Sequence, residues 1–139
     1  MKRALYWFRN DLRTTDNPSL LRALSENDEV LPVFVFDDFW WMEDAFGHRK
    51  TGVFRTKFLV ESVADLRESI ESLGGSLLIR RGRSAEVLAA LARRLDCRRV
   101  YAQAEHTLEE QQIEAEVARQ LPLVLTEGHT LIHPDDLPV

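Results

Sequence analysis

The chain has 139 residues, of which 45% are hydrophobic and 29% charged, and its formal net charge is −5. These values are typical of one globular domain with its own core, and we assign residues 1–139 to that domain. No apolar run approaches the roughly 20 residues that a membrane helix needs. The apolar run at residues 4–8 is too short and too aromatic for a signal peptide. We therefore expect a cytoplasmic protein without a membrane partner. The acidic balance argues against a domain that grips DNA by itself.

The first part of the chain alternates strand and helix signals. An apolar run at residues 5–8 predicts a strand, and Asn17 followed by Pro18 is typical of a helix N-terminus. The continuous apolar run at residues 30–36 predicts a strand that is buried on both faces. We expect the helix between these strands to bury three leucines, Leu20, Leu21 and Leu24.

A long helix is predicted after an irregular, aromatic loop. The loop spans residues 37–50 and the helix residues 51–73. Apolar residues in the helix recur at spacings of four and three, which places them on one face. Gly74 and Gly75 supply the backbone freedom that ends such a helix. The inward positions that we expect are Leu59, Val63, Leu66, Ile70 and Leu73.

The second half repeats the alternation. Ser84 is the expected N-cap of one helix, and Thr107 with Glu110 forms a capping box at the start of the next. Their inner positions are Leu88, Leu91 and Leu95, then Ile113, Val117 and Leu121. We expect strands at residues 76–79, 100–102 and 123–125, with room for a short sixth strand at residues 130–132.

This order of elements predicts the fold class. Five alternating strands and helices form a parallel sheet with helices on both faces. Right-handed crossovers make it a three-layer α/β/α, doubly wound, five-stranded parallel sheet of Rossmann-like type. Ligands of such sheets bind beyond the carboxyl ends of the strands, near the point where the strand order reverses. The loops of interest are therefore residues 9–16, 37–50, 81–84 and 103–107.

The common nucleotide and metal signatures are missing from the sequence. No G-x-G-x-x-G follows the first strand, and no G-x-x-x-x-G-K-[ST] occurs anywhere. The four histidines lack metal-type spacing, so we expect no metal site. Residues 81–84 place free amides beside arginines, which suits either an anion or an ordinary loop and cap.

Three other segments carry unusual chemistry. Residues 9–13 are denser in charge than a turn needs, which suits either a ligand contact or internal ion pairs. Residues 36–41 combine aromatic rings with carboxylates, as a planar ligand would require, but the rings could equally pack on the domain or on a partner domain. Glu110 is explained by the capping box, whereas Glu109 is not. A carboxylate there offers two acceptors to a pyrimidine-like edge.

Several motifs resemble one known family. Residues 6–13, YWFRNDLR, followed by DNPSL at residues 16–20, resemble the opening of DNA photolyases and cryptochromes. Residues 54–67 are similar to the R-x-x-F-L-x-E-S-x-x-D-L-R helix of that family. The resemblance covers essentially the whole chain. The segments that look most like the DASH-type cryptochrome branch are residues 100–110 and 130–138.

The resemblance implies an N-terminal α/β domain that binds an antenna pigment, followed by a larger helical domain. The pigment is methenyltetrahydrofolate or, in some members, a deazaflavin. The helical domain holds FAD and docks the pyrimidine dimer, and we expect the chain to be a fragment that lacks it. The antenna glutamate of the family lies eight residues after the tyrosine of the fourth strand, which corresponds to Glu109 here. The antenna-binding residues that we expect are Glu109, Phe36, Asp37 and Arg9.

The family also implies the activity of the whole protein. The parent would use blue or near-ultraviolet light and FAD to repair pyrimidine dimers, as a carbon–carbon lyase. This fragment would hold no catalytic residue, and it would meet damaged DNA only through the full-length parent. Two alternatives stay open at this point. The chain could be a small nucleotide-binding protein of the universal-stress type, or a docking scaffold for the helical domain that binds no ligand.

Overall fold

The structure is a computed structural model, and it describes residues 1–41 and 53–127. The sixth strand expected at residues 130–132, and most of the loop expected at residues 37–50, lie outside this part of the chain. The elements in chain order are β1 (Arg3–Phe8), α1 (Pro18–Glu26), β2 (Glu29–Asp37), the 3-10 helix η1 (Asp38–Trp41), α2 (Val53–Ser72), β3 (Leu78–Gly82), α3 (Ser84–Arg94), β4 (Arg99–Gln103), α4 (Leu108–Gln120) and β5 (Leu123–Thr126).

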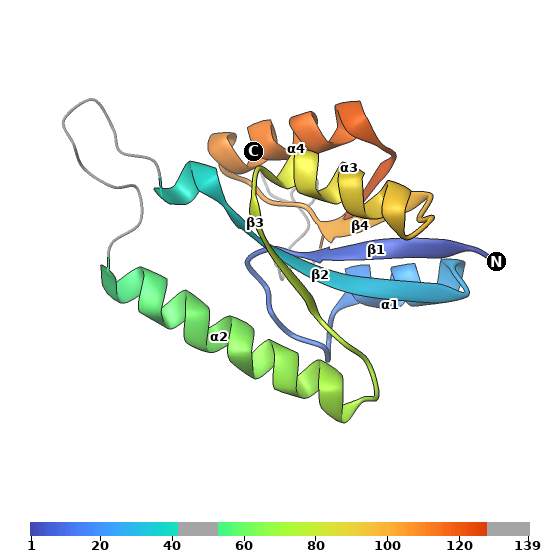
Figure 1. Ribbon diagram of the computed structural model, residues 1–139, viewed down its shortest axis with the longest axis horizontal. Coiled ribbons are helices and arrows are strands. Elements are labelled where there is room, and N and C mark those ends of the chain that lie inside the picture. The colour runs from blue at the N-terminus through green and yellow to red at the C-terminus, as the bar shows by residue number, and fades with distance from the viewer. Residues whose placement is uncertain (42–52, 128–139) are drawn as a thin grey trace, which may run out of the picture.

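The five described strands form one parallel sheet in the order β3-β2-β1-β4-β5. Helices α1 and α2 cover one face of the sheet, and α3 and α4 cover the other (Figure 1). The predicted fold class is therefore confirmed. The order reverses between β1 and β4, so the functional crevice of this sheet type belongs at the carboxyl ends of these two strands.

The central strand β1 builds both halves of the core. Leu5 and Trp7 join the apolar cluster under α3 and α4, while Ala4, Tyr6 and Phe8 join the cluster under α1 and α2. This burial on both faces is what a continuous apolar run predicts for a parallel strand. Most of the predicted inward helix positions are buried as well, namely Val63, Leu66, Ile70, Leu88, Leu91, Ile113 and Val117.

The predicted apolar face of α1 is correct for Leu20, which is half-buried against the core, and wrong for the other two leucines. Leu21 and Leu24 are 69% and 54% exposed, whereas Ser19 and Ala23 face the sheet. Sheet residues beneath the helix fill part of the space there. The ring of Tyr101 is fully buried and its hydroxyl meets Glu26 at 3.1 Å, and the small Ala23 packs in the same cluster.

Two element ends also differ from prediction. Leu73 is 75% exposed because α2 stops at Ser72 and Gly74, at φ +88°, turns the chain away from the helix. Strand β3 runs two to three residues later than expected and carries the exposed Arg80 and Arg81. Charged side chains are typical of an edge strand, where they discourage pairing with other chains.

Candidate functional site

The start of α1 is closed by its own side chains. Asn17 accepts hydrogen bonds from the Leu20 amide and from the Tyr6 hydroxyl, both at 3.1 Å. Pro18, the first helical residue, has no N–H to offer. In dinucleotide-binding sheets, the helix start that follows the first strand holds the phosphates. Here Pro18 lacks a donor and the Leu20 and Leu21 amides already bond to Asn17, which argues against a bound nucleotide at this position.

The start of α3 is closed by Asp37, which lies at the end of β2. One carboxylate oxygen accepts from the Ser84 amide at 3.0 Å and from the Ser84 hydroxyl at 2.6 Å. The other oxygen accepts from the Phe39 amide at 2.9 Å. Ser84 is thus the first residue of α3, and the prediction that it is the N-cap is wrong: Arg83 takes that position. Of the two readings left open for residues 81–84, these contacts favour the ordinary loop and cap, because the Asp37 carboxylate already occupies the helix start.

Arg9 is buried at the carboxyl end of the sheet, with its side chain only 6% exposed. Its guanidinium carbon lies 4.5 Å from the centre of a Trp7 ring, and one nitrogen lies 2.5 Å from the Glu114 carboxylate. The guanidinium also donates to the carbonyl oxygens of Gln103 (3.4 Å) and Glu110 (3.0 Å). All these partners lie inside the domain, which favours the internal ion pairs that the sequence left open for residues 9–13.

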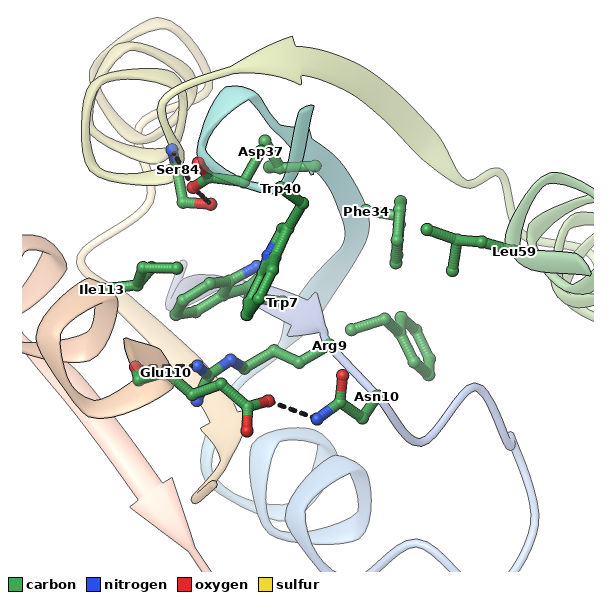
Figure 2. A pocket seen from close by; sticks show the side chains of 12 residues that line it. Trp7, Arg9, Asn10, Phe34, Asp37, Trp40, Leu59, Ser84, Glu110 and Ile113 are labelled. Carbon is green, nitrogen blue, oxygen red and sulfur yellow. Dashed lines mark hydrogen bonds between the residues drawn. The ribbon is translucent and has the colours of Figure 1, made fainter. Parts of the chain in front are cut away.

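The first turn of α4 is capped as predicted. The Thr107 hydroxyl accepts from the Glu110 amide at 3.2 Å and donates to the Glu110 carboxylate at 2.6 Å. The same carboxylate accepts a hydrogen bond from the Asn10 side chain, which ties the loop after β1 to this helix start (Figure 2). Glu110 is therefore buried and engaged at the helix start, although its carboxylate meets the Thr107 hydroxyl where a standard capping box would use the Thr107 backbone N–H.

Glu109 differs from Glu110 in its exposure and in its side-chain contacts. It lies in the first turn of α4, as predicted, and is exposed. Within residues 1–41 and 53–127 its side chain makes no hydrogen bond or ion pair. Its side chain lines an open groove of about 380 Å³ between α4, η1 and the start of α3. The other residues of this groove are Asp37, Asp38, Phe39, Arg83, Gln112, Ile113 and Glu116.

A second cavity lies deeper, between β1, β2 and α4 (Figure 2). Trp7, Arg9, Trp40 and Glu110 are among the residues that line it, and its volume is about 80 Å³. That volume holds roughly two water molecules, whereas small-molecule sites usually measure roughly 300–1,000 Å³. The groove that contains Glu109 reaches this range and the deeper cavity does not.

The four predicted site residues do not share one cavity. Glu109 and Asp37 line the groove, and Asp37 with Arg9 lines the deeper cavity. Phe36 points to the other face of the sheet, toward α2. Its ring packs edge to face on Phe34, with 4.9 Å between the ring centres. Two further groove residues, Gln112 and Glu116, were not predicted from the sequence. Their spacing of three and seven residues from Glu109 is the signal that could have placed them on the same helix face.

Among the described residues, no group of histidine, cysteine, aspartate and glutamate is arranged to hold a metal ion. No helix in the described ranges is both long and apolar enough to cross a membrane. The chemistry available at the groove is therefore that of carboxylates, amide groups, one guanidinium and an aromatic ring.

Comparison with known proteins identifies the family. The model of the DNA photolyase family matches residues 4–139. The chain belongs to this family. Cryptochrome DASH from Natronomonas pharaonis is 45% identical over 99% of the chain, and the match covers 30% of that relative. The crystal structure of a Synechocystis cryptochrome superposes with a TM-score of 0.93 at 33% identity, over 100% of this chain and 30% of that one.

A photolyase from the archaeon Sulfolobus tokodaii, described as containing two FAD molecules, superposes with a TM-score of 0.85 over 99% of this chain and 32% of its own. At 21% identity, this likeness supports the fold alone. The chain spans about 30% of the length of curated relatives such as the cryptochromes DASH, and it corresponds to their N-terminal α/β domain.

Proposed function

We propose that this domain binds a light-absorbing antenna pigment, and that the pigment is methenyltetrahydrofolate held in the groove at Glu109. One observation carries the proposal. Glu109 is an exposed carboxylate that has no partner among the described residues, and it lines the larger of the two cavities at the carboxyl edge of the sheet. Asp37, which also lines the groove, and Glu110, the next residue of α4, have structural tasks that account for their positions.

The chemistry of the groove suits a pterin ring. A carboxylate accepts two parallel hydrogen bonds from a ring N–H and an adjacent amino group. Such a charge-assisted contact contributes about 1.5–3 kcal/mol. Phe39 and Ile113 supply apolar surface beside it. The bound pigment would absorb light and pass the energy on by dipole coupling, so the task of the protein is to hold the ring in one orientation.

The remaining predicted residues take different parts in this proposal. Asp37 joins η1 to α3 on one side of the groove through its hydrogen bonds to both. Arg9 bonds to the buried side of α4 at the Glu110 carbonyl. Phe36 makes no direct contact, because it faces α2. A deazaflavin is a weaker candidate, and FAD would belong to the helical part of the complete protein.

The activity of the complete protein is part of the same proposal. It would be a cytoplasmic, light-driven lyase that repairs pyrimidine dimers in DNA with FAD, and this domain would be non-catalytic. Its partner would be a C-terminal helical domain, since the relatives are about three times longer than the chain. Light-dependent dimer repair by residues 1–139 alone would contradict this division of labour.

Titration of the chain with methenyltetrahydrofolate and with ATP tests the pigment site. Glu109→Gln replaces an acceptor by a donor that faces a donor, and we expect the folate dissociation constant to rise about tenfold, which corresponds to about 1.4 kcal/mol. Glu86→Gln is the matched control, since Glu86 is an exposed carboxylate in the first turn of α3, outside the groove. We expect no change there.

The outcomes separate the three candidate functions. Equal folate affinity in Glu109→Gln and Glu86→Gln would show that Glu109 does not contact the pigment. Binding of ATP alone would favour the nucleotide-binding alternative, which the closed start of α1 argues against. Binding of neither ligand would favour the docking scaffold.

A further inference from the structure

Helix α4 presents two neighbouring faces with different environments. Glu109, Gln112 and Glu116 line the groove, whereas Glu110 and Glu114 are buried toward the end of β1. The groove residues are spaced by three and four, and the buried pair by four, so each set shares one side of the helix. The rotation of α4 about its own axis therefore decides where Glu109 points.

Directional bonds from the loop after β1 hold the buried face. Arg9 reaches the Glu114 carboxylate with one nitrogen and the Glu110 carbonyl with the other. The Glu114 carboxylate also accepts from the Glu105 amide at 3.2 Å, which ties it to the segment after β4. The side chains of Arg9 and Glu114 are 6% and 9% exposed, so solvent screens this pair little.

Small rotations of α4 would matter for binding. The carboxylate of a helical glutamate lies roughly 6 Å from the helix axis, well outside the Cα radius of about 2.3 Å, so a rotation of roughly 10° moves it by about 1 Å. A hydrogen bond tolerates a donor–acceptor range of only about 2.7–3.2 Å. Such a rotation would therefore disrupt the contact that Glu109 makes with a pigment.

The apolar contacts of α4 cannot fix the rotation equally well. Ile113 and Val117 pack into the core, but hydrophobic burial is non-directional. A guanidinium fork has a planar geometry that admits few orientations of its partners. The bonds of Arg9 to two residues one helical turn apart supply the missing directional constraint.

We infer that Arg9 and Glu114 act as a lock on the rotation of α4 and thereby aim Glu109 into the groove. Arg9 is then a positioning residue for the pigment site and does not touch the pigment. This inference rests on the proposed function of Glu109, and the experiment separates the two.

The test measures what Glu109→Gln does to folate affinity in three backgrounds. The first is the unaltered chain. The second is Arg9→Met/Glu114→Met, which removes both buried charges together, so that neither is left unpaired. The third is Arg3→Met/Glu29→Met, the matched control, because Arg3 and Glu29 form an ion pair at the opposite end of β1. Thermal unfolding followed by circular dichroism verifies that each variant folds.

We expect Glu109→Gln to weaken binding about tenfold in the unaltered chain and in the control, and less than about twofold without the lock. A tenfold loss in all three backgrounds would overturn the lock and leave the pigment site intact. No loss in the unaltered chain would overturn the pigment site, and the lock with it.

Arg9→Lys covers the case in which the double variant does not fold. Lysine keeps the charge beside Glu114 but has one nitrogen, which cannot reach both Glu114 and the Glu110 carbonyl as the fork does. We expect Glu109→Gln to weaken binding less in this background than in the unaltered chain. A full tenfold loss in Arg9→Lys would refute the lock.

Discussion

Replacement of Asp37 by asparagine should destabilise the domain strongly. The Asp37 carboxylate accepts hydrogen bonds from Ser84 on one oxygen and from Phe39 on the other, and it is 7% exposed. Asparagine has a single side-chain oxygen, so its amino group must face one of these donors. The loss of a charge-assisted bond costs about 1.5–3 kcal/mol, and the lost attraction to the start of α3 adds about 0.5–1 kcal/mol. We expect a total of about 2–4 kcal/mol.

Urea unfolding followed by circular dichroism measures this loss, and Asp38→Asn is the matched control. Asp38 is the next residue, its side chain is half exposed, and its one described ion pair, to Arg81, spans 3.5 Å. Exposed pairs of this kind contribute less than about 1 kcal/mol. If Asp37→Asn and Asp38→Asn unfold within about 0.5 kcal/mol of each other, Asp37 does not hold β2, η1 and α3 together as we argue.

Two further stability predictions follow from buried polar groups. Arg9→Met alone should cost about 3–5 kcal/mol, because it leaves the Glu114 carboxylate buried without its cation, and Arg9→Met/Glu114→Met should recover most of that loss in urea unfolding. Equal losses in both variants would contradict this. Burial raises the pKa of the Tyr6 hydroxyl, so its contribution is complete below the unfolded value of about 10 and is lost as pH rises through the folded value. Unfolding free energy should therefore fall more steeply above pH 10 in the unaltered chain than in Tyr6→Phe, and parallel pH profiles would refute the assignment.

Much of the fold could be predicted because its main signals are local. Apolar runs mark β1 and β2, and Asn17 with Pro18 marks the start of α1 through bonds that span three residues. The buried face of α1 could not be predicted in the same way. It depends on sheet residues that are far away in sequence, such as Tyr101, whose buried side chain reaches Glu26 of α1.

The candidate site was predictable only in part, for a similar reason. The capping box leaves Glu109 without a structural task, and that argument needs only neighbouring residues. The true partners of Asp37 and Arg9 are remote: Ser84 lies 47 residues from Asp37, and Glu114 lies 105 residues from Arg9. Only the order of the strands brings these pairs together, and side-chain patterns within one element do not encode it.

At the carboxyl edge of this sheet, side chains of the protein occupy the helix starts where related sheets bind phosphate. Asn17 occupies the start of α1 and Asp37 occupies the start of α3. The groove that remains is acidic, and its guanidinium, Arg83, already lies 3.4 Å from the Glu116 carboxylate. A phosphate in the groove would meet carboxylates, and no unpaired cation among the described groove residues would offset their charge. A ligand edge rich in N–H groups would instead meet hydrogen-bond acceptors. The groove therefore favours ligands that donate hydrogen bonds, and under the proposed function a pterin ring would present such donors to Glu109.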